Sequence, residues 1–567
     1  MKKKVLAIGS TMLLMTPLAA ISCVDVSVKG EFKKTAVEFR NLASGHYPIS
    51  SNQINLYFKR GNKNSIPYVA IEDMSKTLGG FYKRSYWNKK LYSKEGKVRY
   101  DASGLSILGF NSIVFDFVND TIEIDSPYFF QTLVRNSSQT NYSRQIKTKG
   151  EDIKEQSTKY VYDLGKYHID IVYENSKTLI PFSVYNTLFC SQNYYNMYFN
   201  GDTVLGTFFD LSDRTQGIEE FKSQGSIWLS QKAQNDYQRL DNYYNLLFTL
   251  DHFYGLKKIK NIDSFEKFID KDQKALLISN DPTKYNEAYS NLFYKKLNEL
   301  HTSLRMYGFH TNPTQKIDDA ARNKSEEFKE STRISNKLKQ ARKTLQEQHD
   351  AKKFLIKDNT AYIIFDEFHA AADKDLKLPD YGKDTFETIR EKLDTIATKH
   401  PQVKNVVFDI SQNGGGNIGA MLRTLGLLTN KDIKTHSLDT LWNINSTTTY
   451  QIDANKDNNF NDDDAFSQFN YFILTGKNTF SAANMFAAAA KELKIAKIIG
   501  QKSGGGTASI IPIVLQDGTS TIISSQDTGW FINDDKKQDL EFGVPVDIEI
   551  SYDDFYDLNL LVTEINK

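Results

Sequence analysis

The amino-acid sequence predicts a multidomain protein of mixed α+β and α/β class, with a strand-rich N-terminal module, a helical segment and an α/β core. Its 567 residues exceed the roughly 100–200 residues of a single domain. Short runs of alternating apolar residues recur over residues 24–235, which is typical of strands. From residue 353 onward strands alternate with helices, which is typical of an α/β core. The formal net charge of +1 gives no field that would attract nucleic acid, so no nucleic-acid partner is expected.

Residues 1–23 are predicted to be a lipoprotein signal peptide. A basic run at 2–4 precedes an apolar stretch at 5–20, which is too short and too early for an ordinary membrane span. The sequence Ala-Ile-Ser-Cys at 20–23 resembles a bacterial lipobox, with Ala in place of the usual first Leu. Acylation of Cys23, for example with palmitate, would anchor the chain to the outer face of a bacterial cell membrane. The alternative is a cleaved signal in which this cysteine is incidental.

The module at 24–235 contains two similar units in which a strand leads into a short helix. The first unit, at 65–80, ends on a glycine cap, and the second lies at 160–189. The shared plan suggests a duplicated accessory module. With Cys23 acylated, Cys190 is the other cysteine of the chain, so no intrachain disulfide is expected.

Two segments link this module to the core. Residues 236–312 are expected to be helical, because apolar residues recur at three- and four-residue spacing. Residues 313–352 are dense in Lys, Glu, Arg and Gln and have few large apolar residues. They are expected to form a charged helical connector that is exposed or mobile, with no chemistry of its own.

The core occupies residues 353–567. Its expected elements, in order, are a strand at 360–368, a helix at 384–400, a buried strand at 403–411, a helix at 418–429, a strand–helix–strand segment at 471–506 and a hairpin at 509–525.

The segment at 471–506 carries a buried strand, a tight turn with Ser481, an Ala-rich helix, a second strand and a glycine loop. A Ser at the start of a helix lies beside free backbone N–H groups and the positive end of the helix dipole, which favour a negative oxygen. The Ala run at 487–490 lets this helix pack closely on the sheet. Ser is also a common N-cap, so a purely structural role is the alternative for Ser481.

Three consecutive glycines, Gly414 to Gly416, separate a buried strand from a helix. Glycine lets the backbone approach a ligand closely and direct N–H groups at it. Phosphate binding is the competing interpretation. However, the segment lacks the lysine of a GxxxxGK[ST] motif, and its strand ends in Asp409, which would repel phosphate. An oxyanion hole is the better interpretation.

Two more residues complete a candidate set for serine catalysis. His301 lies where a helix gives way to a strand, and His is the commonest base for a Ser proton. A structural role is the alternative for an isolated histidine. Glu541 precedes a Gly-Val turn and a final strand, where a carboxylate can hold a histidine in the correct tautomer. Asp539 is the reserve candidate for that carboxylate.

The ordered motifs VVFDISQNGGG, TFSAANMF, KIIGQKSGGG and EFGVPVDIEI resemble those of the C-terminal-processing and tricorn-core serine peptidases. The sequence LHTSL around His301 is similar to the Asp-Gly-His-Thr region of that family, with Glu299 and Leu300 in place of Asp-Gly. The resemblance covers residues 241–550. It implies a crotonase-like core of the ClpP/crotonase type.

The resemblance also implies site residues. Ser481 is then the nucleophile, and the oxyanion hole is formed by backbone N–H groups of Gly415 (or Gly414) and Ala482.

The family has two catalytic designs. A Ser-Lys dyad needs a Lys in the glycine loop, but the alignment puts Gly506 there and Lys502 four residues early. The other design uses Ser, His and Glu, and the Ser-to-Glu spacing of 541 − 481 = 60 suits it. A Ser481-His301-Glu541 triad is therefore expected. No peptide-binding PDZ segment is found between His301 and the core, so substrate selection stays open.

The sequence DANKDNNFNDDD at 453–464 places oxygen side chains at loop positions 1, 3, 5, 7, 9 and 12, which resembles an EF-hand calcium loop. The candidate ligands are Asp453, Asn455, Asp457, Asn459, Asn461 and Asp464. Asn458 replaces the turn glycine and Asp464 the bidentate Glu, so weak binding of a structural calcium is expected. An acidic surface loop without metal is the alternative. No cofactor is expected to be required.

The sequence therefore predicts a membrane-anchored extracellular serine endopeptidase that acts on a protein or peptide substrate through an acyl-enzyme. The alternative is a catalytically inactive surface lipoprotein of the same fold that acts as a binding or adhesion module, because fold alone does not decide function. The joint presence of Ser, His, Glu and the glycine loop favours the enzyme. Neither the natural substrate nor the oligomeric state can be read from the sequence.

Overall fold

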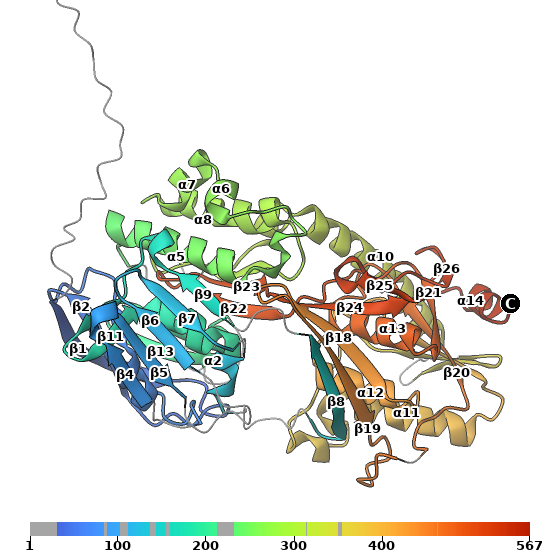
Figure 1. The fold of residues 1–567 in the computed structure, drawn as a ribbon. Coiled ribbons are helices and arrows are strands. Elements are labelled where there is room, and N and C mark those ends of the chain that lie inside the picture. Colours follow the sequence, from blue (N-terminus) through green and yellow to red (C-terminus); the bar gives the residue numbers. More distant parts are fainter. Residues whose placement is uncertain are drawn as a thin grey trace, which may run out of the picture.

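The computed structural model describes residues 31–83, 88–102, 112–126, 128–135, 143–154, 159–212, 232–312, 315–349, 354–461 and 463–567. Within these ranges, no helix combines the length and apolarity needed to cross a bilayer. The predicted signal peptide and Cys23 lie outside the described residues. The described chain forms a C-terminal α/β core and an N-terminal half in which helices lie beside sheets (Figure 1).

The core is built on a six-stranded sheet in which the edge strand β15 is antiparallel and the other five strands run parallel. In sheet order the strands are β15 (Leu355–Lys357), β16 (Thr360–Ile364), β17 (Asn405–Asp409), β20 (Asn470–Thr475), β21 (Ala496–Gly500) and β26 (Ile548–Glu549). Every residue of β17 is buried, as a central parallel strand covered on both faces requires. The predicted α/β core is confirmed.

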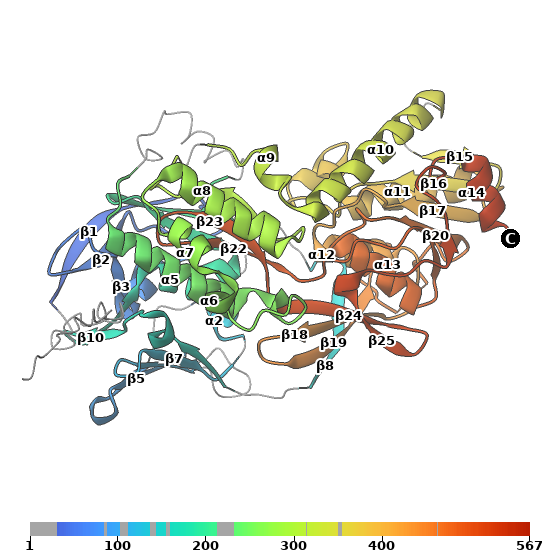
Figure 2. The same cartoon turned by 90° about the horizontal axis from the view of Figure 1, so that it is seen from above.

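Helices cover both faces of this sheet (Figure 2). The helices on one face are α11 (Thr385–Lys399), α12 (Ile418–Gly426) and α13 (Ala482–Glu492), and those on the other are α10 (Glu326–His349) and α14 (Leu558–Ile565). Phe386, Met421 and Phe486 of the first set pack with Phe408 of β17 in one apolar cluster. The Ala run in α13 is buried as predicted, which brings that helix close to the sheet.

Helix α10 corresponds to the charged connector that the composition predicts to be exposed or mobile. The structure differs, because Ile334, Leu338 and Leu345 are buried in the cluster beneath this helix. The three residues recur at four- and seven-residue spacing, which is enough for one apolar stripe on an otherwise polar helix. Ser331 Oγ donates to Asn478 Oδ1 at 2.6 Å, in the turn that precedes Ser481. The helix is therefore part of the core.

A second sheet of the core takes one strand from the N-terminal half. Its order is β25 (Lys536–Asp539), β24 (Asp527–Asn533), β18 (Ile433–Asp439), β19 (Ile444–Ile452) and β8 (Ile146–Lys154). Strand β8 pairs antiparallel with β19 along its whole length. The module expected at 24–235 is thus interleaved with the core rather than separate from it.

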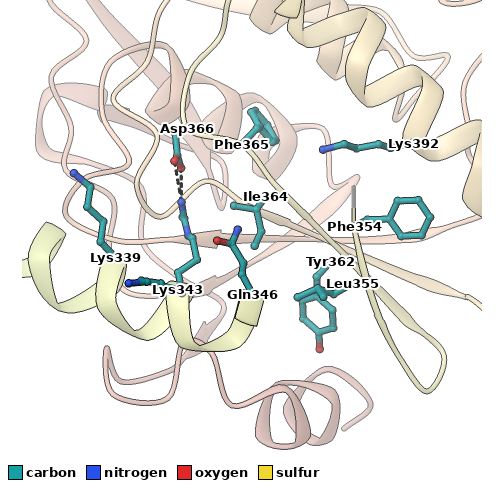
Figure 3. A pocket seen from close by; sticks show the side chains of 11 residues that line it. Lys339, Lys343, Gln346, Phe354, Leu355, Tyr362, Ile364, Phe365, Asp366 and Lys392 are labelled. Atoms are coloured by element: carbon teal, nitrogen blue, oxygen red, sulfur yellow. Dashed lines mark hydrogen bonds and ion pairs between the residues drawn. The ribbon is translucent and has the colours of Figure 1, made fainter. Parts of the chain in front are cut away.

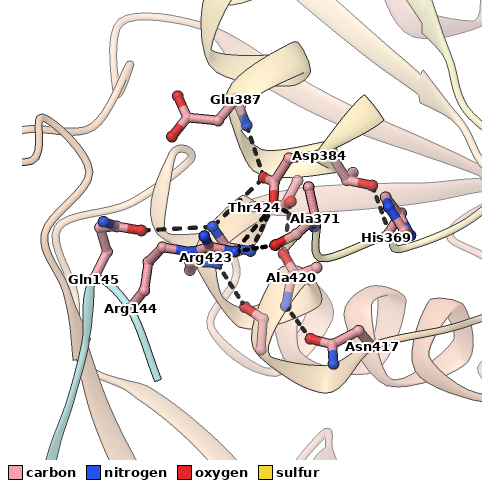
Figure 4. A network of polar contacts seen from close by, with 12 residues as sticks. Arg144, Gln145, His369, Ala371, Asp384, Glu387, Asn417, Ala420, Arg423 and Thr424 are labelled. Carbon is pink, nitrogen blue, oxygen red and sulfur yellow. Dashed lines mark hydrogen bonds and ion pairs between the residues drawn. The ribbon is translucent and has the colours of Figure 1, made fainter. Parts of the chain in front are cut away.

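Buried charges fix the segment that leads into β8 (Figure 4). Arg144 Nη1 pairs with Asp373 at 2.7 Å, and its Nη2 donates to the Ala371 carbonyl at 2.7 Å. Beside it, Arg423 Nη2 pairs with Asp384 Oδ2 at 3.1 Å, and both side chains are at most 1% exposed. An unpaired buried charge is costly, so the buried Arg144 and Arg423, which both lie at ion-pair distance from Asp384, depend on that carboxylate for their places.

The N-terminal half contains a seven-stranded and a five-stranded sheet. The first has the order β10 (Val172–Glu174), β11 (Lys177–Pro181), β3 (Tyr68–Ala70), β2 (Gln53–Lys59), β1 (Phe32–Asn41), β13 (Thr203–Phe208) and β12 (Tyr195–Phe199). The second has the order β4 (Asn88–Tyr92), β5 (Lys97–Asp101), β6 (Ser112–Asp116), β7 (Thr121–Ile124) and β9 (Tyr160–Asp163).

Both predicted strand–helix units are present. Strand β3 leads into α1 (Ile71–Thr77), β11 leads into α3 (Phe182–Tyr185), and the two strands pair antiparallel. The predicted helical segment contains α5 (Asp236–Phe253), α6 (Phe265–Phe268), α7 (Lys271–Leu277) and α8 (Pro282–Ser290), and the short α2 (Phe129–Thr132) and α9 (Asp319–Arg322) lie on either side of it in the chain. Helix α5 begins at a capping box between Asn235 and Gln238, which satisfies donors that a helix start leaves free.

A hairpin of the core, β22 (Ile510–Val514) and β23 (Ser520–Ser524), reaches into the N-terminal half, where β23 pairs with β14 (Ser303–Met306) (Figure 1). Its tip residue Asp517 is buried. The Asp517 carboxylate accepts a hydrogen bond from Tyr285 Oη, and its N–H donates to Asn242 Oδ1 at 3.0 Å. The Asp517 carbonyl accepts from Phe309 N–H at 2.8 Å. The helical segment therefore holds the hairpin tip.

We expect Asp517→Ala to lower the free energy of unfolding by ~2–4 kcal/mol, because it leaves the buried Tyr285 hydroxyl without its acceptor. Urea unfolding followed by circular dichroism measures the change. Asp394→Ala, on the exposed face of α11, is the matched control and should be close to neutral, because no side-chain bond is lost there and Ala favours a helix. Equal stability of the two variants would contradict the role given to Asp517.

Candidate active site

Ser481 lies in the turn between β20 and α13, at the carboxyl edge of the core sheet. Its φ of 56° and ψ of −124° fall outside the regions that residues with a side chain prefer. Such strain persists only where the surroundings fix it. Here Ser481 N–H donates to the Gly505 carbonyl at 2.9 Å, and the Ser481 carbonyl accepts from Met485 N–H at 3.0 Å. The side chain makes no capping bond to α13, so the structural N-cap role does not account for this residue.

The glycine loop after β17 lies directly against Ser481. A Cβ built on Gly415 would come within 2.7 Å of Ser481 Cβ and 2.9 Å of Ala482 N, and the φ of Gly415 is 107°. No residue with a side chain fits there without moving the nucleophile turn. Ala482 N–H opens α13 and has no backbone acceptor among the described residues. Gly415 N–H donates to Asn413 Oδ1 at 2.9 Å, so this loop donor is already bonded within the loop.

His301 reaches this turn from the segment between the helices and β14. Its ring packs edge-on against the ring of Phe480, the residue before Ser481, with centroids 4.6 Å apart. Burial lowers the pKa of the His301 imidazole to about 4, against a smaller opposing effect of the Ala508 backbone. The ring is therefore neutral at pH 7, as a general base requires. Its Nδ1 is buried and forms no hydrogen bond with the described part of the chain.

Glu541 lies in a 3₁₀ turn that follows β25. Its Oε2 accepts hydrogen bonds from Thr507 N–H at 2.9 Å and Ala508 N–H at 3.1 Å. Burial raises the pKa of the Glu541 carboxyl to about 7, and the charge of Glu299 acts in the same direction. Near neutral pH this group is therefore present in both protonation states.

The structure gathers the predicted Ser, His and Glu in one region and links them through backbone. The loop after β21 bonds to two of them: Gly505 O accepts from Ser481 N–H, and Gly506 N–H donates to Glu541 O at 3.4 Å. Ala508 binds the Glu541 carboxylate and also lies against the His301 ring. For the residues that the structure describes, no direct hydrogen bond joins the three side chains.

Glu299 is a second carboxylate at this site, and no sequence pattern predicts a role for it. Its Oε2 accepts His301 N–H at 2.7 Å, and its Oε1 accepts the Ser524 hydroxyl at 3.0 Å. Burial raises the pKa of this carboxyl as well. The feature of the sequence that could have indicated this role is Glu299 in the position that resembles Asp-Gly before His301. Its bond to Ser524 depends on the pairing of β14 with β23, which are far apart in the sequence.

Asn484 is a further site residue that no motif in the sequence singles out. It is fully buried in the first turn of α13, where its Nδ2 donates to the Leu540 carbonyl at 2.9 Å. Its Oδ1 accepts the Ser503 hydroxyl at 2.6 Å, and Ser503 Oγ accepts Val544 N–H at 2.6 Å. Asn484 thus ties the nucleophile helix to the loop of Glu541. A single amide inside an Ala-rich buried helix was the available signal, because buried polar groups are paired.

Lys502 and Asp539, the alternative candidates for the base and for the carboxylate, have other surroundings in the structure. Lys502 is exposed, and in the described chain it forms no hydrogen bond or ion pair with Ser481 or any carboxylate. Asp539 accepts Glu541 N–H at 2.8 Å through its side chain, so it caps the turn that presents Glu541.

The predicted calcium loop is closed by its own hydrogen bonds. Asp453 Oδ2 accepts Asn458 N–H at 2.9 Å, and Asn455 Nδ2 donates to Asp457 at 3.2 Å and to Asp464 at 2.7 Å. In the described ranges, no three His, Cys, Asp or Glu side chains gather as ligands for a metal ion. Calcium binding here stays a prediction, and no chemistry at the site is routed through it.

Comparisons with known proteins address the core. The model of peptidase family S41 matches residues 359–550, which include the glycine loop, Ser481 and Glu541 but not His301. A search of curated protein sequences found no match.

Several solved structures are similar over part of the chain. A candidate peptidase from Parabacteroides merdae is 16% identical with a TM-score of 0.39, over 55% of this chain and 89% of its own. A lipoprotein from Streptococcus agalactiae is 15% identical with a TM-score of 0.32, over 53% of this chain and 88% of its own. The tricorn protease is 11% identical with a TM-score of 0.32, over 91% of this chain and 60% of its own.

The family match falls on the core whose motifs predicted it, and its boundaries enclose the strained serine turn and the glycine loop that packs on it. This chain therefore carries a serine-type peptidase domain of family S41.

Proposed function

We propose that this protein is a serine endopeptidase that hydrolyses peptide bonds through an acyl-enzyme formed on Ser481. The observation that carries the proposal is the strained turn of Ser481 at the start of α13, packed against Gly415 inside the family S41 domain. A strained residue held by its surroundings is typical of active sites. The helix start adds N–H donors and a positive dipole end where negative charge develops.

In the proposed reaction, Ser481 Oγ attacks the substrate carbonyl carbon while His301 accepts the hydroxyl proton. The resulting oxyanion is stabilised by the N–H groups of Ala482 and Gly414. His301 then gives its proton to the leaving amine, and the acyl-enzyme remains. Water, deprotonated by His301, releases the acid product and restores Ser481.

Glu541 acts in this scheme by positioning. It accepts the N–H groups of Thr507 and Ala508, and Ala508 lies against the His301 ring. Glu299 fixes the backbone of His301 from the other side. The Ser-His-Glu triad is therefore proposed to operate with its carboxylate coupled to the base through the 507–508 segment.

We propose further that the protein is anchored to the outer face of the bacterial cell membrane through acylated Cys23. The proposal rests on the basic and apolar segments before Cys23 and on its lipobox-like sequence.

Ser481→Ala should reduce peptide hydrolysis by ~10⁴-fold or more and abolish labelling by a fluorophosphonate probe, because the nucleophile is lost. Gel fluorescence of the labelled protein is the measurement, with an unchanged melting temperature as the check on folding. Ser509→Ala, an exposed serine close to the same loop, is the matched control and should label normally. A wild-type protein that does not label would favour the inactive binding module.

His301→Ala should reduce kcat/KM by ~10²–10⁴-fold, because no general base remains. In the wild type, activity should persist below the ordinary pKa of histidine and fall only as the pH approaches 4, since burial lowers the pKa of His301 to about 4 and protonated imidazole cannot accept the Ser proton. Lys502→Ala should have little effect on the profile. Activity that instead requires alkaline pH and disappears in Lys502→Ala would establish a Ser-Lys dyad.

Cys23→Ser should abolish incorporation of an alkynyl palmitate by the producing cells and move the protein from the membrane fraction to the medium, because the acyl anchor is lost. Cys190→Ser is the control, since that thiol is buried and should not affect labelling. Label retained on the Cys23 variant would refute the anchor.

A further inference from the structure

A hollow of about 380 Å³ lies at the carboxyl edge of the core sheet, between α10, the β15–β16 hairpin and α11 (Figure 3). Its floor is apolar and includes Leu355, Tyr362 and Ile364. Lys339 and Lys343 of α10 stand on one side, and Lys392 of α11 extends from the other toward Ile364 and Phe365. The hollow thus combines an apolar base with cationic walls.

The charges of the hollow are not balanced by the protein. Arg342, also in its lining, is satisfied by Asp366 at 2.7 Å and by Asp409 at 3.1 Å. Within the described residues, Lys339 and Lys392 have no carboxylate at ion-pair distance. Lys343 reaches only Glu347, at 3.7 Å, where both side chains are mostly exposed. Such an exposed pair is weak. The side chains of Lys339 and Lys343 point away from the apolar floor, whereas Lys392 extends toward it, so Lys392 is the cation that the hollow offers directly to an anion (Figure 3).

Lys392 is the group that a bound anion would relieve most. Burial lowers the pKa of its ammonium, with only a minor opposing effect of Glu391. A cation that is partly removed from water and lacks a partner gains from a carboxylate placed beside it.

The hollow is connected to the candidate active site through the sheet. Strand β16 ends at the hollow and β20 ends at Ser481, with only β17 between them. Phe368 N–H donates to Gly415 O at 2.8 Å, so the segment after β16 runs beside the glycine loop. Two strand spacings are roughly 10 Å, and an extended peptide advances ~3.3 Å per residue. A peptide bound at Ser481 therefore reaches the hollow with a residue roughly three to five positions from the scissile bond.

A second hollow, of about 460 Å³, adjoins the first, and the residues common to both linings are Phe354, Ile364, Phe365, Asp366 and Lys392. The rest of its lining includes the acidic Glu367, Asp380 and Glu391 beside Lys383, so its charge is mixed. Lys392 therefore lies between the two hollows, and the apolar surface continues from the first into the second.

We propose that the cationic hollow is a substrate subsite that takes an acidic side chain of the bound peptide, beside an apolar residue. The inference rests on the proposed peptidase function, because it assigns a substrate class to that site. The anion is identified by its chemistry, a carboxylate that pairs with Lys392 while neighbouring methylene groups lie on the apolar floor.

The test uses the full-length Ser481→Ala protein, so that binding is measured without turnover. The probes are fluorescein-labelled decapeptides rich in Leu and Ala, each with an amidated C-terminus. One peptide series carries a single Gln at each position in turn, and a second series carries Glu at the same positions. Fluorescence anisotropy gives Kd for each pair. At one position Glu should bind about tenfold more tightly than Gln, a preference that weakens with added salt.

Lys392→Met keeps most of the side-chain volume and should abolish the Glu preference at that position. Lys399→Met, exposed near the end of the same helix, is the matched control and should retain it. Lys392→Glu should reverse the preference, so that a Lys peptide binds better than a Glu peptide.

Three results would overturn the subsite. The first is equal affinity for Glu and Gln at every position, or no binding of any peptide. The second is a Glu preference that survives Lys392→Met combined with Lys343→Met. The third is a Lys392-dependent increase in affinity that appears only when the C-terminal amide of the peptide is replaced by a free carboxylate. That result would mean that the hollow binds the C-terminus of the substrate rather than an acidic side chain. Failure of the peptidase proposal is seen separately, as absence of fluorophosphonate labelling at Ser481 in the wild type.

Discussion

The antiparallel pairing of β14 with β23 is the constraint on which the candidate site depends. His301 precedes β14 in a segment that lies outside the family S41 match, and this pairing brings that segment to the serine turn. The pairing continues through side chains, because Ser524 N–H donates to Thr302 Oγ1 at 3.1 Å and the Ser524 hydroxyl donates to Glu299. The far end of the same hairpin is held by the helical segment. Two parts of the chain thus share one hairpin, and the site lies where they meet.

Burial disfavours charge throughout this site. It lowers the pKa of His301 to about 4 and raises that of Glu541 to about 7, and Glu299 shifts in the same direction as Glu541. Burial thus disfavours the charged form of each of these three groups. In the proposed attack, negative charge develops on the substrate oxygen, beside backbone N–H groups and a helix start, while His301 becomes positively charged. A poorly solvated site makes those fixed dipoles more effective.

Much of the core could be predicted because its signals are local. The fully apolar β17, the glycine run after it and the Ala-rich α13 each have a short sequence pattern, and the parallel sheet then places their ends at one edge. The helix of the charged connector can be predicted from its composition but its burial cannot, since Ile334, Leu338 and Leu345 are too few to stand out against its charge. Asn484 and Glu299 were not given roles, because their partners are fixed only by tertiary packing. The linkage of Glu541 to His301 through Ala508 has no sequence signal at all.

Strand β8 comes from the N-terminal half but pairs within a sheet of the core, and this affects how the chain folds during synthesis. During translation β8 is synthesised early and its partner β19 much later, so the edge of β8 stays unpaired in the meantime. An exposed strand edge is a template for pairing with other chains. The sequence of β8, IKTKGEDIK, is dense in charge and is almost wholly exposed even after pairing. Charged side chains on an unpaired strand edge oppose aggregation. The Lys, Glu and Asp residues of β8 should therefore protect this strand from pairing with other chains until β19 has been synthesised.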